Sequence, residues 1–175
     1  PSHKAWLPPR PATLVGAPWD AAPRRPSVLD RNSPVYREAV SAWLREQGIN
    51  DPKPTLSQLW RIDLEGDGRD EVLVAASRHR GSATSTVAGD YSVLLLRKLV
   101  GDKVATLPIE SNLYPEACIA ECALAVHEAF GALDLNGDKQ LEIITKSSAY
   151  ESTTQAVHEV DGTRVAKRLE WTCGS

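Results

Sequence analysis

Two acidic segments of the sequence contain the residue types that bind metal ions. The first reads RIDLEGDGRDEVLVAAS (61–77) and the second reads ALDLNGDKQLEIITKSS (132–148). Each crowds oxygen-bearing side chains into a short stretch and then becomes apolar, as a buried strand would. The side chains at relative positions 1, 3, 5 and 9 are Asp63, Glu65, Asp67 and Glu71 in the first segment and Asp134, Asn136, Asp138 and Glu142 in the second.

This spacing suits a hard cation. Oxygen ligands at alternate residues of a tight turn, closed by a later acid, can surround calcium at about 2.3 to 2.6 Å, and the main-chain carbonyls at position 7, Arg69 and Gln140, add a ligand to each loop. Calcium accepts roughly six to eight oxygens in loose geometry, whereas magnesium requires a strict octahedron and zinc prefers nitrogen and sulfur. The candidate cofactor is therefore calcium. The alternative is a pair of plain hairpin turns, because Asp, Asn and Gly form turns without any ion.

The elements around the loops form a repeat. The interval in the sequence from Asp63 to Asp134 is the same as the interval from Glu71 to Glu142, so the two loops are copies in one register. The turn VGDKVA also reappears as VDGTRVA near the C-terminal end, so the unit spans four strands rather than one loop. We expect repeat one at 58–109 and repeat two at 127–173, with the strands of the first repeat at 58–63, 70–77, 90–99 and 103–109.

A proline-rich arm and a helix precede the repeats. Residues 1–32 hold seven of the 12 prolines, a density that forbids regular helix and interior strand. We expect this arm to pack on the domain that follows, 33–175. Ser33 as N-cap, Pro34 as first helical residue and Gly48 as a left-handed stop predict a helix over 34–47. Its apolar residues fall on one face at helical spacing and are expected in the core: Val35, Ala39, Val40, Trp43 and Leu44.

The loops differ from an EF-hand and resemble another family. An EF-hand needs a bidentate Glu at position 12 and a helix on each side, but position 12 here is Val74 or Thr145, each in an expected strand. The two segments resemble the strand, calcium loop and strand of FG-GAP and VCBS-type repeats, which have a pattern close to DxNxDGxxD before an apolar strand. The whole chain is also similar to small exported bacterial proteins of unknown function. The N-terminal third lies outside the resemblance to the repeats.

The resemblance implies a mainly β fold (α+β) with calcium at both loops. Two repeats are too few to close a propeller, so we expect two blade-like antiparallel four-strand units, packed together or joined in one curved sheet, with the helix over one face. The first loop has Glu65 where the family has Asp or Asn, and the second has Lys139 where the family has Gly. Because Gly eases a positive φ and the first loop carries more carboxylates, we expect the first loop to bind calcium more tightly.

Composition argues against some classes of protein. The chain has 175 residues, 42% of them hydrophobic, and no apolar run approaches the roughly 20 residues that span a bilayer. A net charge of −3 without a basic patch argues against nucleic acid as a partner. Three cysteines allow at most one intrachain disulfide, through Cys173 or between Cys118 and Cys122, and three buried thiols are the alternative.

These observations favour a calcium-binding structural or binding module without catalysis. The histidines (His3, His79, His127 and His158) are scattered outside any nucleophile or metal motif. The loops resemble extracellular calcium modules, so we expect an extracytoplasmic monomer (periplasmic, secreted or lipid-anchored) that contacts an unknown protein or surface ligand. Two alternatives stay open. One is an interaction or inhibitor module acting through the long loop 77–90, with His79 and Arg80 as partner-binding residues, and the other is a metal-dependent hydrolase.

Overall fold

The described part of the chain contains one helix and nine strands. The computed structural model describes residues 18–174, so most of the expected proline-rich arm, residues 1–17, lies outside the described residues. The elements are β1 (Ser27–Val28), α1 (Pro34–Glu46), β2 (Leu56–Ile62), β3 (Glu71–Arg78), β4 (Asp90–Val100), β5 (Lys103–Tyr114), β6 (Val126–Leu133), β7 (Glu142–Ala149), β8 (Ser152–Asp161) and β9 (Arg164–Gly174).

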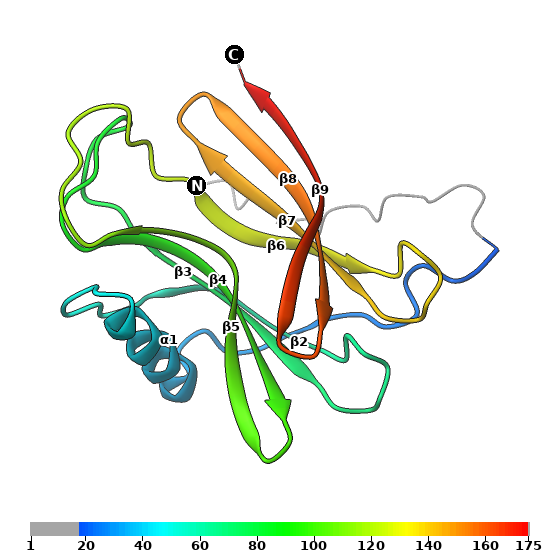
Figure 1. Ribbon diagram of the computed structural model, residues 1–175. Helices are drawn as coiled ribbons and strands as arrows, with labels where there is room; N and C mark the ends of the chain where they lie inside the picture. Colours follow the sequence, from blue (N-terminus) through cyan, green and yellow to red (C-terminus); the bar gives the residue numbers. More distant parts are fainter. Residues whose placement is uncertain (1–17, 175) are drawn as a thin grey trace, which may run out of the picture.

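The strands form two antiparallel sheets (Figure 1). One has the order β1-β2-β3-β4-β5 and the other has the order β6-β7-β8-β9, so within each sheet every strand pairs with the next strand in the sequence. Short connections are sufficient for such a meander. The expected mainly β fold, with one helix and two antiparallel sheets, is confirmed. The strand ends differ from those expected, because β2 begins at Leu56 and β5 continues to Tyr114.

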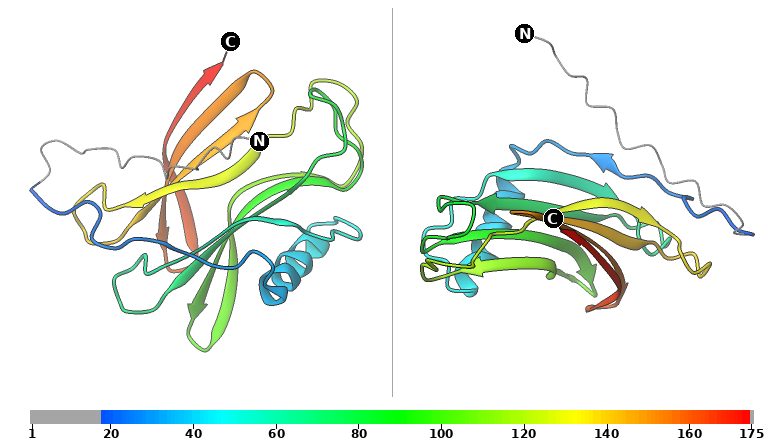
Figure 2. Two further views of the ribbon diagram at one scale, coloured as in Figure 1. Left: turned by 180° about the vertical axis from the view of Figure 1, so that it is seen from behind. Right: turned by 90° about the horizontal axis from the view of Figure 1, so that it is seen from above.

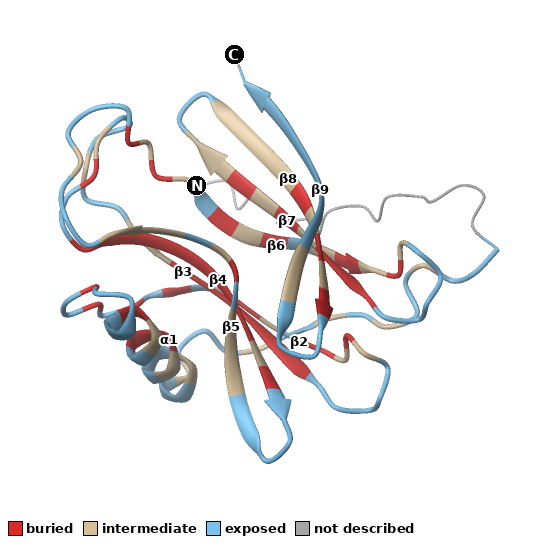
Figure 3. Cartoon of the chain, viewed as in Figure 1, coloured by how far each residue is buried: buried red, intermediate tan, exposed pale blue. Residues whose placement is uncertain are grey.

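The helix and the two sheets make three layers (Figures 1 and 2). Helix α1 packs on one face of the five-stranded sheet, and the four-stranded sheet packs on the other face. The side chains of β3 alternate between the two cores: Leu73 and Ala75 face the other sheet, whereas Val72 and Val74 face the helix. Both faces of β3 and β4 are therefore buried (Figure 3), which explains their nearly continuous apolar sequences.

Helix α1 ends close to the expected position. Gly48 has a φ of +84°, and the N–H of Ile49 returns to the carbonyl of Leu44 at 3.0 Å, so the chain leaves the helix through a left-handed residue with an apolar residue beyond it. Val40 and Leu44 are buried as expected. The expectation for Val35 is wrong, since this side chain is 66% exposed. The buried stripe runs instead through the neighbouring Tyr36, about 100° further round the helix.

Gln58 of β2 links the two sheets. Its side-chain Nε2 donates to the carbonyl of Ala129 in β6 (2.9 Å), and its Oε1 accepts the N–H of the same residue (2.8 Å). The strand pairing of β6 with β7 is irregular between Ala129 and Gly131, so the main chain of Ala129 has both groups free to meet an amide from the other sheet. One side chain thereby satisfies two main-chain groups at the boundary between the layers.

Replacement of this glutamine is expected to destabilise the protein. The Gln58→Ala variant leaves a half-buried N–H and a half-buried carbonyl without partners, so we expect the free energy of unfolding to fall by about 1 to 3 kcal/mol. Urea unfolding followed by tryptophan fluorescence measures this change. The matched control is Gln47→Ala at an exposed site beyond the helix, which is expected to change stability by less than about 0.5 kcal/mol. Equal stability of the two variants would contradict the proposed link.

Helix α1 does not provide a membrane span. Within residues 18–174, no helix has the length and apolar character needed to cross a bilayer. The 13 residues of α1 instead have one face on the five-stranded sheet and the other in solvent.

Candidate metal centre

The first acidic loop, which joins β2 to β3, folds around the side chain of Asp63. Its Oδ1 accepts hydrogen bonds from the N–H groups of Gly66 (2.6 Å) and Asp67 (3.2 Å), and its Oδ2 accepts one from Gly68 (3.0 Å). Asp67 accepts a bond from the N–H of Arg69 (2.8 Å). Aspartate side chains commonly hold turns in this way. The loop therefore closes on its own carboxylates.

The second acidic loop, which joins β6 to β7, has most of the same internal bonds; the N–H of Asp138 bonds Asn136 instead of the first aspartate. Asp134 accepts hydrogen bonds from the N–H groups of Gly137 (2.6 Å) and Lys139 (3.0 Å). Asp138 accepts one from the N–H of Gln140 (2.8 Å). The donors and acceptors stand at the same relative positions as in the first loop, so the shared spacing in the sequence produces a shared local geometry.

Both loops require a left-handed residue at position 6. Gly68 has a φ of +84° in the first loop, and Lys139 has a φ of +74° in the second. This conformation costs about 1 kcal/mol or more for a residue with a Cβ. Lys139 is therefore the less suitable residue, as the sequence indicated, but the main chain of the second loop still follows that of the first.

The acid at position 9 closes each loop from the start of the next strand. Glu71 accepts the N–H of Leu64 through Oε2 (2.8 Å), and Glu142 accepts the N–H of Leu135 in the same way (2.7 Å). Burial raises the pKa of both carboxyl groups, although these main-chain hydrogen bonds act in the opposite direction. The acid at position 9 therefore bonds the main chain of its own loop, as it would in a plain hairpin turn.

Glu142 has an oxygen atom that its loop leaves unsatisfied. The residue is 4% exposed, and its Oε1 has no hydrogen-bond partner among the described residues. Because Oε2 of the same carboxylate bonds the N–H of Leu135 inside the loop, Oε1 lies at the loop as well. A buried carboxylate oxygen is costly unless a donor or a cation meets it. This oxygen can therefore accept a hydrogen-bond donor or a cation at the second loop.

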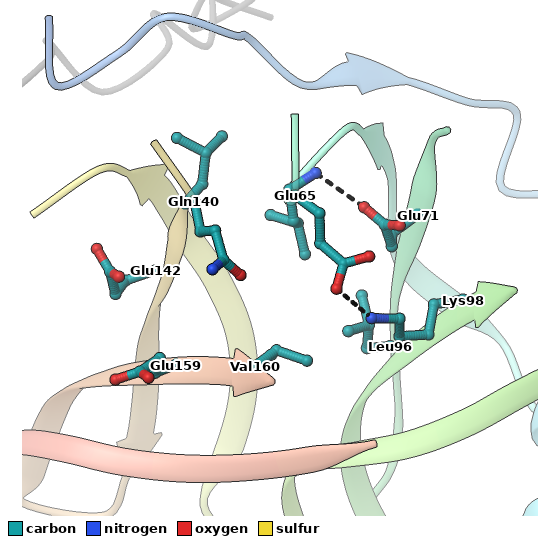
Figure 4. A pocket seen from close by; sticks show the side chains of 10 residues that line it. Glu65, Glu71, Leu96, Lys98, Gln140, Glu142, Glu159 and Val160 are labelled. Atoms are coloured by element: carbon teal, nitrogen blue, oxygen red, sulfur yellow. Dashed lines mark hydrogen bonds and ion pairs between the residues drawn. The ribbon is translucent and has the colours of Figure 1, made fainter. Parts of the chain in front are cut away.

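The two loops lie side by side at one end of the two sheets. The N–H of Leu141 in the second loop donates to the carbonyl of Leu64 in the first at 2.8 Å. A small cavity of about 10 Å³ lies between them, near the lower limit for one water molecule. Figure 4 shows the acids of the first loop on one side of this cavity and residues of the second loop on the other. The polar side chains that line it are Glu65, Glu71, Lys98, Gln140, Glu142 and Glu159.

Two cations from outside the acidic pattern contact the first loop. Lys98 of β4 is only 4% exposed, and its Nζ lies 2.7 Å from Oε1 of Glu65 (Figure 4). Arg24 donates from Nε to the carbonyl of Asp63 (2.6 Å) and from Nη2 to that of Leu64 (3.2 Å). Sequence reasoning missed both residues. The one available signal was a lysine in the apolar run of β4, because a buried lysine nearly always has an acidic partner.

The loops are candidates for a cation but are not preformed cages. Within residues 18–174, no three His, Cys, Asp or Glu side chains converge closely enough to hold an ion. Each carboxylate oxygen carries about two lone pairs, so the main-chain bonds described above leave acceptor capacity. Asn136 and the carbonyl of Gln140 would add neutral oxygens of the kind calcium accepts. The donors of the second loop therefore fit a hard cation, and in the first loop Glu65 is already paired with Lys98.

The long loop between β3 and β4 is held in place by its own residues. Buried Asp90 accepts the N–H groups of Arg80, Gly81 and Val87, and Nε of Arg80 lies 3.1 Å from it. Nε2 of His79 is 3.1 Å from the carbonyl oxygen of Ser85. The two residues expected to bind a partner, His79 and Arg80, are thus engaged within their loop. They lie at the opposite end of β3 from the acidic loops.

The segment 118–122, which is closed by a disulfide, lies beside this long loop. Cys118 is bonded to Cys122, and Cys173 is an exposed free thiol, which decides among the pairings that the sequence left open. Thr86 of the long loop pairs with Cys118 as an isolated bridge. Ile119, between the two bonded cysteines, is 89% exposed. The sequence pattern did not single out this residue, because a lone isoleucine carries no signal of its exposure.

Two of the scattered histidines are buried between the sheets. His158 of β8 places Nε2 3.0 Å from Oε1 of Glu110 in β5, and Lys167 of β9 lies 3.1 Å from the same oxygen. Burial raises the pKa of Glu110, but the hydrogen bonds from these two residues outweigh it and lower the pKa below its ordinary value. His127 of β6 bonds Ser147 through Nδ1 at 2.7 Å, and burial lowers its pKa. The side chain of His158 therefore joins the two sheets, that of His127 bonds within its own sheet, and neither belongs to the acidic loops.

Comparison with known proteins adds no relative. The chain matches no family model, no curated protein and no solved structure. The resemblance to FG-GAP and VCBS-type repeats therefore stays a prediction that depends on the residues of the two loops.

Proposed function

We propose that this protein is a calcium-binding β module in which the ion has a structural role. The observation that carries the proposal is the buried Oε1 of Glu142, which has no hydrogen-bond partner among the described residues and lies at a loop of oxygen donors. All the donors in the second loop are carboxylate, amide or carbonyl oxygens, which suit calcium better than zinc or copper. Calcium bound there would supply the positive charge that this oxygen needs.

The proposal includes a relationship to FG-GAP and VCBS-type repeats. It is supported by two loops that have the same spacing of acids in the sequence and share the same main-chain hydrogen bonds. Each loop also leads into a central strand of its sheet, β3 or β7. This arrangement of strand, acidic loop and strand is what the resemblance implies.

We place the protein outside the cytoplasm. Extracellular calcium modules bind with a Kd of about 10⁻⁴ to 10⁻³ M, which resting cytosol cannot fill. The disulfide between Cys118 and Cys122 supports the same location, because such bonds persist in oxidising compartments.

The two alternatives have less support. The cavity beside the acidic loops is far smaller than an organic substrate needs. A larger hollow of about 320 Å³ lies near the start of α1, and none of the loop acids line it. The hydrolase therefore stays a prediction without a substrate site at the loops. The interaction module also stays a prediction, and exposed Ile119 is a better candidate contact than His79 or Arg80.

Calorimetric titration tests the proposed function. We expect calcium to bind with a Kd of about 10⁻⁴ to 10⁻³ M, and magnesium to bind much more weakly because it dehydrates reluctantly. Asp138→Ala should weaken calcium binding at least about tenfold, since it removes a charged ligand from the loop tip. The control is Asp102→Ala, which removes an exposed acid from the turn between β4 and β5 and should leave binding unchanged. Absence of calcium binding up to about 10 mM would disprove the proposal.

A further inference from the structure

The N-terminal arm places a different side chain on each acidic loop. At the first residue of loop one, the carbonyl of Asp63 accepts a hydrogen bond from Nε of Arg24 (2.6 Å). At the equivalent residue of loop two, the carbonyl of Asp134 accepts one from the indole N–H of Trp19 (3.0 Å). The same position is therefore met by a permanent cation in one loop and by an uncharged ring in the other.

The glycine at position 4 of each loop shows the same difference. A Cβ added to Gly66 would lie 2.9 Å from Nη1 of Arg24, and a Cβ added to Gly137 would lie 3.1 Å from the ring of Trp19. Each arm side chain thus lies directly against its loop. Arg24 also donates to the carbonyl of Lys139 at 2.7 Å, so it bridges to the edge of the second loop, but its remaining contacts are with the first.

A second built-in cation distinguishes the loops at position 3. Glu65 of loop one is paired with the buried ammonium group of Lys98 at 2.7 Å. The equivalent residue of loop two is Asn136, whose amide bonds only with Asp138 of its own loop: Nδ2 donates to Oδ2 (3.0 Å), and Oδ1 accepts the N–H (2.9 Å). Among the described residues, no cation of the four-stranded sheet contacts Asn136 in the way that Lys98 contacts Glu65.

Strand pairing shows what stands in place of Lys98. In the first sheet Arg97, the residue before Lys98, pairs with Val72, which directly follows Glu71. In the second sheet His158, the residue before Glu159, pairs with Ile143, which directly follows Glu142. Lys98 of β4 and Glu159 of β8 therefore hold equivalent positions beside the two loops. Glu159 is an acid, and its carboxylate is paired with Arg168 at 2.7 Å. The second loop therefore receives no positive charge from this position, although both residues line the cavity between the loops (Figure 4).

We infer that the two loops have different counter-ions: Arg24 and Lys98 compensate the first loop from within the protein, and one calcium ion compensates the second. The inference rests on the proposed function and names which loop performs it. An ion entering the first loop would meet the positive charges of Arg24 and Lys98, which already contact that loop, and like charges in contact repel. An ion entering the second loop meets three carboxylates and the cation of Lys139, and one of the carboxylates, Glu142, has a buried oxygen without a partner among the described residues. The order of affinity expected from counting acids is thereby reversed.

Matched glutamine variants of the closing acids test this inference. Glu142→Gln and Glu71→Gln each keep an oxygen that can accept the main-chain N–H and each lose one charge, so both should fold. We expect wild-type protein to bind one calcium per chain in calorimetry. Glu142→Gln should weaken this binding at least about tenfold, because it removes a charged ligand, whereas Glu71→Gln should change it less than about twofold. The shift of melting temperature on adding calcium should follow the same order.

A lysine variant tests the built-in cation itself. Lys98→Met keeps the unbranched shape and most of the length of the side chain and removes its charge, so a second calcium should bind at the first loop and raise the stoichiometry from one toward two. A stoichiometry that stays at one would contradict the role of Lys98. Loss of binding in Glu71→Gln rather than Glu142→Gln, or two equal sites in the wild type, would overturn the inference and leave the proposed function standing. Absence of any calcium binding would overturn the proposed function itself.

Discussion

Calcium at about 5 to 10 mM is expected to raise the melting temperature of this protein by about 2 to 10 °C, and a chelator is expected to reverse the rise. An ion that binds only the folded chain stabilises it by RT ln(1 + [Ca]/Kd), which is about 1 kcal/mol at a fivefold excess over Kd and about 2.7 kcal/mol at a hundredfold excess. In a chain of this length each kcal/mol shifts the melting temperature by about 2 to 4 °C. The second loop closes the hairpin of β6 and β7, which supplies residues to the core between the sheets, so the whole fold should respond.

Scanning calorimetry in chelator and in about 5 to 10 mM calcium measures this effect, a range set by weak extracellular sites. Magnesium at the same concentration is the control for ionic strength and should produce a much smaller shift, because it tolerates irregular oxygen geometry poorly. Equal melting temperatures in chelator and in calcium would mean that the loops are plain turns held by Asp63 and Asp134. In that case the acids would serve only the hydrogen bonds that the structure shows.

Removal of the Asp90 carboxylate is expected to cost about 1.5 to 3 kcal/mol of stability, the range for hydrogen bonds to a charged group, because Arg80 is half exposed and stays solvated without it. Asp90 is fully buried and accepts the N–H groups of Arg80, Gly81 and Val87, which the Asp90→Ala variant leaves without an acceptor. Urea unfolding measures the loss, and limited proteolysis should show faster cleavage within 77–90. Asp102→Ala is the control and should change stability by less than about 0.5 kcal/mol. A loss of similar size in both variants would contradict this account.

The same carboxylate predicts a dependence on pH. Burial raises the pKa of Asp90, but the hydrogen bonds from Val87, Arg80 and Gly81 outweigh it, so the pKa in the folded protein lies below the ordinary value. Its contribution to stability is complete above about pH 4, the ordinary aspartate pKa, and is lost as the pH falls through the lowered folded value. Wild-type protein should therefore lose more stability than Asp90→Ala between about pH 4 and pH 2. Parallel loss in the two proteins would show that other groups control acid unfolding.

Much of the fold was predictable because its signals are local. The alternation and length of the apolar runs indicated the strands, and Pro34 and Gly48 marked the helix within one residue at each end. The prediction that Val35 is buried was wrong because the apolar pattern of the helix alone does not show which residues at the edge of its apolar face reach the sheet. Only contact with β2, β3 and β4 packed the half-buried Tyr36 against the core and left Val35 in solvent.

The sequence by itself determined the internal structure of the two acidic loops, since every bond from Asp63, Glu71, Asp134 and Glu142 to the loop backbone spans seven residues or fewer. The same spacing of acids recurs in the second loop and gives a similar loop structure there.

The tertiary structure alone decided which side chains from outside meet each loop. Arg24 is 39 residues from Asp63, Lys98 is 33 residues from Glu65, and Trp19 is 115 residues from Asp134. No periodicity links residues at such separations, because they meet only after the arm has crossed both loops and the strands have packed into layers. Opposite charges in the sequence have many potential partners, and burial in one particular fold selects among them. For that reason, the acidic pattern could indicate a cation, but only the folded chain shows that the first loop already has its own.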